Sequence, residues 1–203
     1  MPARSLTRIV AIGAVAALSL TACANNAGSE GSGGGGGGGS KDLVISTDLP
    51  LQGSSGTQSA STNNLIQLYL DQVGGKAGDY NITLKTYDDS TAAKGAWDDA
   101  ACAKNATDHV ANENEVAVMG TFNSGCAKIE VPTLNNDSTG PMLMVSHANT
   151  NPGLTKTWDT GEPDKYYPTG TRNYARVITT DDYQGQGAAA FAKNDLKATK
   201  AFV

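Results

Sequence analysis

The stretch VAVMGTFNSGC at residues 116–126 decides the fold, because it joins a buried strand to the start of a helix. The apolar run 116–119 is short and bounded by polar residues, which is typical of a parallel strand buried on both faces. The helical pattern then runs over 124–134. Pro132 lacks an amide donor and is expected to kink or end that helix.

The same order of strand and helix recurs on both sides of this stretch. Apolar runs predict further strands at 43–45, 82–87, 142–145, 174–178 and 201–203. Helical spacing predicts helices over 61–73, about 92–112 and 184–195. The polar segment 147–173 is predicted as one long loop. This alternation predicts an α/β fold with a doubly wound, mainly parallel sheet that binds ligands at the carboxyl ends of its strands.

The composition excludes several classes of function. The 203 residues include 15 Lys and Arg against 20 Asp and Glu, a net charge of -5, and 39% are hydrophobic. These values suit a soluble globular protein and argue against nucleic-acid binding, which requires a basic surface. The cysteines form no C-x-x-C pair, and no metal site or cofactor is predicted. His109 and His147 have no evident nucleophile beside them, so the chain is not expected to be an enzyme.

The first forty residues are expected to lie outside the fold. Residues 1–23 carry two arginines, a twelve-residue apolar run and the sequence Leu-Thr-Ala-Cys, which resembles the lipobox of bacterial lipoproteins. The resemblance implies cleavage before Cys23 and lipid attachment to its thiol, although an ordinary secretory signal is the alternative. Residues 24–40 are rich in glycine and are predicted to be a flexible linker.

Four sequence motifs and four single residues near the end of the chain carry a further resemblance. They are PLQG at 50–53, YDD at 87–89, GTFNSGC at 120–126, SHANTNPGLT at 146–155, and Arg176 with Asp181, Gln184 and Gly185. Together they resemble the branched-chain amino-acid (leucine-type) binding family of ABC-transporter substrate-binding lipoproteins. The resemblance implies the type I periplasmic-binding-protein fold, with a first lobe at 41–173 and the start of a second lobe at 174–203. Because the sequence stops within a predicted strand, we expect it to be an N-terminal fragment.

Backbone amides at the start of the helix over 124–134 have no partner within that helix and attract anions. Ser124 lies there and is predicted to bind a ligand carboxylate, although a plain N-cap is the alternative. The resemblance implies that the carbonyl of Ala148 and the hydroxyl of Thr150 bind the ligand ammonium. Three further residues, Gln58, Asn149 and Asp181, are candidate ligand contacts. A surface N-cap is the alternative role for Asp181. Because Gln58 and Asn149 are polar, they favour a polar amino acid or an amide as the ligand.

The resemblance implies a lipid-anchored receptor on the extracytoplasmic face of the cell membrane, which passes a small zwitterion to an ABC permease. The alternative is the extracellular sensing domain of a membrane signalling receptor. Export places the remaining cysteines in an oxidising compartment, which favours a disulfide between Cys102 and Cys126 over two free thiols.

Overall fold

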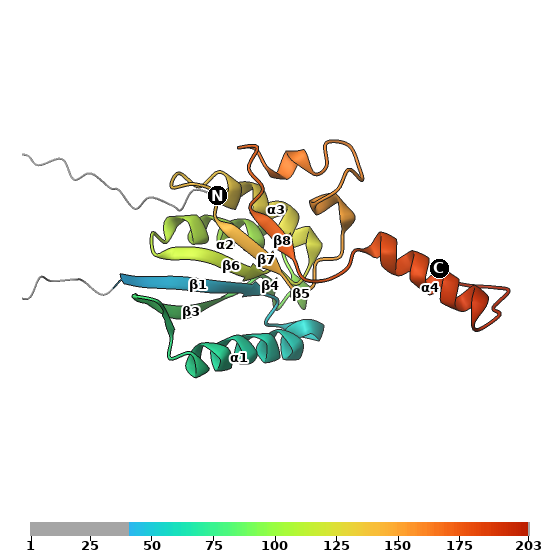
Figure 1. Ribbon diagram of the computed structural model, residues 1–203, viewed down its shortest axis with the longest axis horizontal. Helices are drawn as coiled ribbons and strands as arrows, with labels where there is room; N and C mark the ends of the chain where they lie inside the picture. Colours follow the sequence, from blue (N-terminus) through green and yellow to red (C-terminus); the bar gives the residue numbers. More distant parts are fainter. Residues whose placement is uncertain (1–40, 203) are drawn as a thin grey trace, which may run out of the picture. The chain divides into compact units, whose positions relative to one another are not determined.

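A computed structural model describes residues 41–202 of the chain. The predicted signal sequence, the lipid attachment at Cys23, the linker and Val203 lie outside the described residues. Figure 1 shows one twisted sheet with helices on both of its faces. The strands follow the order β2-β3-β1-β6-β7-β8. No helix among residues 41–202 is both long enough and apolar enough to cross a membrane.

Five strands of this sheet are parallel, and β2 (Lys76–Ala77) pairs antiparallel with β3 at one edge. The parallel strands are β3 (Tyr80–Asp88), β1 (Lys41–Leu49), β6 (Glu115–Gly120), β7 (Leu143–Ser146) and β8 (Tyr174–Arg176). The prediction of a doubly wound, mainly parallel sheet is therefore confirmed. The two-lobe division at 173/174 stays a prediction.

The helices cover the two faces of the sheet unequally. Helix α1 (Gly56–Gln72) lies on one face, whereas α2 (Asp99–Ala111) and α3 (Ser124–Asn135) lie together on the other. Helix α4 (Asp181–Asn194) follows β8 and has no buried residue. Three short 3-10 helices connect these elements, namely η1 (Gly53–Ser55), η2 (Pro152–Leu154) and η3 (Asp164–Tyr166).

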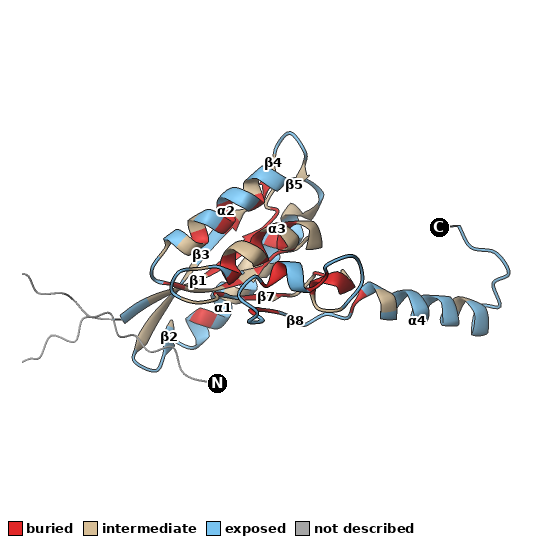
Figure 2. Ribbon diagram, turned by 90° about the horizontal axis from the view of Figure 1, so that it is seen from above, coloured by how far each residue is buried: buried red, intermediate tan, exposed pale blue. Residues whose placement is uncertain are grey.

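The hydrophobic core lies between the sheet and the pair α2 and α3, where the buried segments gather in Figure 2. Val118 of β6 and Met144 of β7 are fully buried there against Val131 and Leu134 of α3. Burial of such side chains is the main stabilising contribution to a fold of this kind. Because Val131 and Leu134 flank Pro132, core packing holds the last turn of α3, which continues to Asn135. The helix therefore does not end at Pro132 but continues for three further residues, and the kink at Pro132 stays a prediction.

The predicted helix over 92–112 begins later than expected. Residues before it form a small antiparallel pair, β4 (Ser90–Thr91) and β5 (Ala96–Trp97). Helix α2 starts after Asp98, whose carboxylate accepts the amides of Ala100 and Ala101. An acidic N-cap defines a helix start more strongly than the alanine-rich composition upstream. Trp97 is consequently outside the helix, and residues 201–202 show no strand.

The segment 147–173 is irregular, as predicted, but it is not a solvated loop. Leu154, Tyr166 and Tyr167 are buried in the core. Glu162 accepts hydrogen bonds from the hydroxyl of Tyr166 at 2.6 Å and from Lys128 of α3 at 2.9 Å. These bonds lower the pKa of Glu162 to about 2. The segment is therefore packed against α3 and is part of the folded structure.

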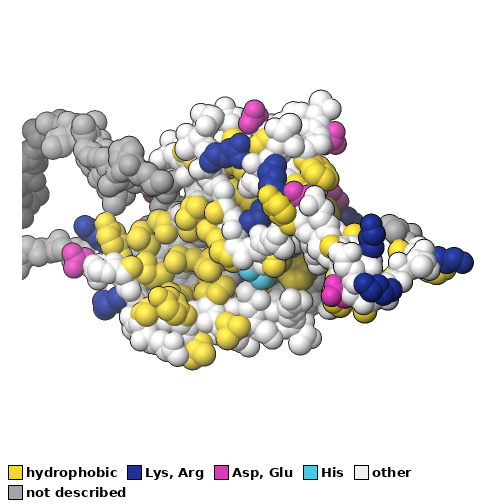
Figure 3. All heavy atoms as spheres, turned by 45° about the vertical axis from the view of Figure 1, so that its right-hand side comes forward, with side chains coloured by type: hydrophobic (Ala, Val, Ile, Leu, Met, Phe, Trp, Pro, Cys, Tyr) yellow, Lys and Arg dark blue, Asp and Glu magenta, His cyan; other side chains and the backbone are white. Residues whose placement is uncertain are grey.

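The sheet face that carries α1 is partly open. A hollow of about 630 Å³ is lined there by mainly apolar side chains, and Figure 3 shows hydrophobic side chains gathered over one face of the molecule. Its lining residues are Ile45, Thr62, Leu65, Ile66, Tyr69, Leu70, Met119, Val145, His147 and Val177. Parallel strands usually carry apolar residues on both faces, which accounts for this apolar surface.

The predicted disulfide forms on the opposite face of the sheet, between α2 and α3. Cys102 of α2 and Cys126 of α3 are joined, and both are fully buried. The bond connects the two helices that cover the core, close to the start of α3.

We expect the double substitution Cys102→Ser and Cys126→Ser to lower the free energy of unfolding by about 3.5 kcal/mol, because it releases a closed loop of the unfolded chain. Urea denaturation of the oxidised protein and of the variant measures the difference. Equal midpoints would show that the disulfide contributes nothing to stability.

Candidate functional site

Two loops meet at the carboxyl edge of the sheet, the loop 121–123 between β6 and α3 and the loop 147–151 after β7. The hydroxyl of Ser146 connects them, because it donates to the Thr121 carbonyl at 2.8 Å. The same oxygen accepts the amides of Ala148 at 3.1 Å and Asn149 at 2.9 Å. The loop after β7 therefore turns directly beside the start of α3.

Asn149 completes this connection. Its side chain is fully buried, and its amide nitrogen donates to the carbonyls of Thr121 at 2.9 Å and Phe122 at 3.1 Å. Its side-chain oxygen accepts the hydroxyl of Tyr174 at 3.0 Å. Burial raises the pKa of Tyr174 to about 12, so this hydroxyl remains a donor at neutral pH. The side chain that was predicted to face a ligand has its partners within the protein.

Arg176 of β8 holds the same loop from the other side. One guanidinium nitrogen donates to the carbonyls of Asn149 at 2.7 Å and Asn151 at 2.8 Å, and a second donates to the Thr155 hydroxyl at 3.0 Å. The sequence motif includes Arg176, but no local pattern indicates this role, because the bonded residues lie 21 or more positions away. The loop is thereby held in one conformation.

The first turn of α3 has no capping side chain. Asn123 is the N-cap, and its side chain makes no capping bond, so the alternative that Ser124 is the N-cap is wrong. Ser124 is the first helical residue, and its hydroxyl oxygen accepts the amide of Asn151 at 3.2 Å. Because the oxygen accepts there, the hydroxyl proton remains available to a second partner.

Trp97 lies against this helix start. A Cβ atom built on Gly125 would come within 2.4 Å of the Trp97 ring, so only glycine allows this contact. Trp97 falls within the helix predicted over about 92–112, whereas the structure gives it a half-buried position in β5, beside the first turn of α3. An aromatic surface therefore borders the amides.

The predicted site residues are distributed as follows. Ser124, Ala148 and Thr150 are half-buried in the two adjoining loops. Asp181 is exposed at the start of α4, and its amide donates to the Thr150 carbonyl at 2.9 Å. Gln58 is exposed on the first turn of α1, rather than in a loop. The structure thus brings together every predicted position except Gln58, which follows the neighbouring strand β1.

The first loop is held by the acidic residue that ends β3. Asp88 accepts the Leu51 amide at 3.0 Å and the Gln52 side chain at 2.8 Å, and it bonds Ser90. Burial raises the pKa of Asp88, but these hydrogen bonds outweigh burial and lower the pKa below its usual value. Asp88, which belongs to the YDD motif at 87–89, therefore holds the loop after β1.

His147 lies between the loop site and the apolar hollow. It lines the hollow, and its ring meets Phe122 edge-on with centroids 6.0 Å apart. Burial lowers the pKa of His147, so the ring is neutral at pH 7. The site therefore presents helix amides, a hydroxyl, carbonyls and a neutral ring, which are groups suited to binding a small polar solute.

Solved structures share this fold. The leucine-binding protein from Thermotoga maritima matches with a TM-score of 0.61 and 21% identity, over 77% of this chain and 38% of that one. The branched-chain amino-acid transporter substrate-binding protein from Streptococcus pneumoniae, in complex with isoleucine, matches with a TM-score of 0.61 and 19% identity, over 77% and 39%. An ABC-transporter solute-binding protein from R. palustris, in complex with benzoate, matches with a TM-score of 0.57 and 19% identity, over 74% of this chain and 37% of that one.

Neither a protein-family model nor a curated protein matches the sequence. At these identities the structural likeness establishes the fold, which is the predicted type I periplasmic-binding-protein fold. The chain spans about 38% of the length of the first of these structures. The similar proteins are described as a leucine-binding protein and as substrate- or solute-binding proteins of transporters.

We expect Asn149→Ala to lower the free energy of unfolding by about 3 kcal/mol, because it leaves buried polar groups of both loops without a partner. Asn136→Ala, at an exposed position just after α3, is the matched control and should change stability little. Urea denaturation gives the stability, and amide hydrogen exchange should show loss of protection in the loop 147–151. Unchanged protection would contradict the role assigned to Asn149.

Proposed function

We propose that the chain belongs to the solute-binding component of an ABC importer and binds the carboxylate of a small solute at the start of α3. The observation that carries this proposal is the uncapped first turn of α3 beside a hydrogen-bonded loop. An open helix N-terminus combines unpaired amides with a favourable dipole, and both stabilise an anion. The proposed ligand is an amino acid of branched-chain or more polar type.

The ligands named for structures of the same fold support the carboxylate end of the proposal. Those proteins are described in complex with isoleucine, leucine, benzoate and 3,4-dihydroxybenzoic acid. Each of these compounds carries a carboxylate, whereas only the amino acids carry an ammonium group. A site that binds chiefly the carboxylate would accept all of these compounds. In this chain we assign the carboxylate to the Ser124 hydroxyl and the first amides of α3.

The ammonium end is assigned to the loop after β7. The carbonyl of Ala148 and the hydroxyl of Thr150 are the proposed partners, and the carboxylate of Asp181 lies one backbone hydrogen bond from Thr150. Asn149 is assigned to positioning this loop, since its side chain bonds within the protein. Gln58 is proposed to meet the solute side chain, and its polarity favours a polar amino acid or an amide.

The cellular setting is also part of the proposal. The apolar run and the Leu-Thr-Ala-Cys sequence support a lipid anchor at Cys23 on the extracytoplasmic face of the cell membrane. The glycine-rich residues 24–40 would let the folded part reach a permease from that anchor. The proposed partners are the membrane, through the lipid, and an ABC permease.

Fluorescence of Trp97 tests the ligand assignment, because this ring lies beside the first turn of α3. Trp158→Phe removes the other tryptophan, which is exposed. We expect isoleucine to change the Trp97 emission at millimolar concentration and isoleucinamide, which lacks the carboxylate, to have little effect. Ser124→Ala should weaken isoleucine binding about two- to tenfold by removing one hydrogen bond.

Ser138→Ala, at an exposed position after α3, is the matched control and should leave binding unchanged. Equal responses to isoleucine and isoleucinamide, or an unchanged affinity in Ser124→Ala, would contradict the carboxylate site.

Cell fractionation tests the anchor separately. We expect the full chain expressed in a bacterium to remain with the membrane and to incorporate labelled fatty acid, whereas Cys23→Ser should do neither. Cys102→Ser, which retains Cys23, should still be labelled. Fatty-acid label in Cys23→Ser, or a wild-type chain without label, would contradict lipid attachment at this residue.

A further inference from the structure

A buried cluster of titratable side chains lies apart from the proposed solute site. Asp48 near the end of β1, His109 of α2 and Glu130 of α3 are all fully buried. One ligand atom from each lies within 4.8 Å of the others. The three elements that carry them are the central strand and the two helices over the core, so the cluster lies at their junction.

The orientation of His109 is fixed by two carboxylates. Its Nδ1 contacts Oε1 of the buried Glu115, and its Nε2 lies 3.3 Å from Oδ2 of Asp48. When Nδ1 carries the proton and donates it to Glu115, Nε2 and Oδ2 are two acceptors that face each other. Two ligand atoms that each bind a tetrahedral Zn²⁺ ion at 2.0–2.1 Å lie about 3.3 Å from each other. This is the distance between Nε2 of His109 and Oδ2 of Asp48. Metal-binding histidines commonly donate their other ring nitrogen to a carboxylate, and Glu115 lies at that nitrogen of His109.

Two further carboxylates have oxygen atoms without a hydrogen-bond partner among the described residues. They are Oε2 of Glu130 and both side-chain oxygens of Asp89, and both side chains are fully buried. Asp48 is close enough for its charge to act on both of them. Buried carboxylates are ordinarily paired or bound to a metal. The fully buried Oε2 of Glu130, which has no partner among the described residues, is the observation that favours a bound cation in this cluster.

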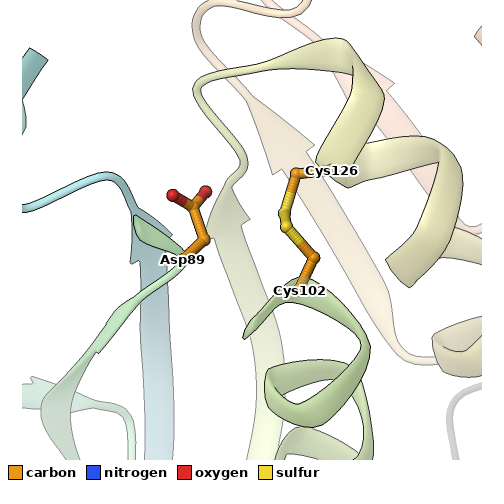
Figure 4. A group of neighbouring side chains, drawn as sticks. All are labelled: Asp89, Cys102 and Cys126. Atoms are coloured by element: carbon orange, nitrogen blue, oxygen red, sulfur yellow. A yellow bond between two sulfur atoms is a disulfide. The ribbon is translucent and has the colours of Figure 1, made fainter. Parts of the chain in front are cut away.

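The neighbouring sulfur atoms do not supply the missing partner. Figure 4 shows Asp89 beside the disulfide of Cys102 and Cys126, where the two sulfurs are bonded to each other. A cysteine binds a metal as a thiolate, so these two are not ligands in the oxidised protein. The available donors are thus one imidazole nitrogen and carboxylate oxygens.

We propose that Asp48, His109 and Glu130 bind a divalent cation of the Zn²⁺ type in a buried structural site. Imidazole together with carboxylates suits Zn²⁺ better than Ca²⁺ or Mg²⁺, which prefer oxygen ligands. Because every ligand is buried, the ion enters as the chain folds, and it then stabilises the junction of β1, α2 and α3. No ligand spacing reveals this site, since Asp48 and His109 are 61 positions apart.

Refolding with and without the metal tests the proposal. The untagged full chain is unfolded, refolded with its disulfide intact in the presence of Zn²⁺ or of a chelator, and freed of excess metal by gel filtration. We expect about one Zn²⁺ per chain and a higher unfolding temperature in the sample refolded with Zn²⁺. Glu130→Gln should lower retained metal at least tenfold. Glu162→Gln, a buried glutamate bonded to Lys128 and Tyr166, is the control and should retain the metal.

Three results would overturn the proposal. The first is a folded wild-type protein that retains no metal, and the second is equal retention by Glu130→Gln. The third is retention only after reduction, which would assign binding to the thiols of Cys102 and Cys126. If the variants do not fold, binding of Co²⁺ to the wild-type protein is measured by visible absorption instead. Visible absorption of a tetrahedral nitrogen and oxygen site supports the proposal, whereas a thiolate charge-transfer band or no absorption opposes it.

Discussion

The hydrogen bonds of Ser146 and Asn149 to the loop before α3 are the constraint on which the proposed site depends. They satisfy the carbonyl groups of Thr121 and Phe122 from within the protein. Irregular backbone at a sheet edge is stable only when its polar groups find such partners. Because side chains of the neighbouring loop satisfy these carbonyls, that loop is held beside the first turn of α3, where we propose that the solute binds. Arg176 adds to the same effect by fixing the loop from β8.

The two faces of the sheet have different roles in the described part of the chain. One face is covered by α2 and α3, which are joined by a disulfide and packed around Val118, Met144 and Leu134. The other face carries α1 and a mainly apolar hollow. The rigid face lies directly behind the start of α3, so the proposed anion-binding amides belong to the most constrained part of the fold. The open face contributes little to holding them.

Much of the fold could be predicted from the sequence, because apolar periodicity is a local property. The five parallel strands and the helices α1, α3 and α4 lie where this periodicity indicates, whereas β2, β4 and β5 were not predicted and the strand expected at 201–203 is absent from residues 201–202. The alanine-rich residues before Asp98 were misassigned, because composition favours a helix there while Asp98 caps the helix only later. The adjacency of Ser124 to the loop after β7 could be predicted from the sheet rule that strand ends share one edge.

The internal bonds of Asn149 and the buried cluster around His109 could not be predicted in the same way. They join residues that are far apart in the sequence, and only the three-dimensional packing brings them together.

The central claim is that the first amides of α3 bind a carboxylate. Nitrogen-15 NMR spectra of the chain, recorded during addition of isoleucine, measure this at the atoms concerned. The account predicts that the amide signals of Gly125 and Cys126 shift most, together with those of Ala148 and Thr150, and that isoleucinamide leaves Gly125 and Cys126 unmoved. Shifts confined to the apolar hollow around Ile45 and Met119, with unmoved α3 amides, would contradict it.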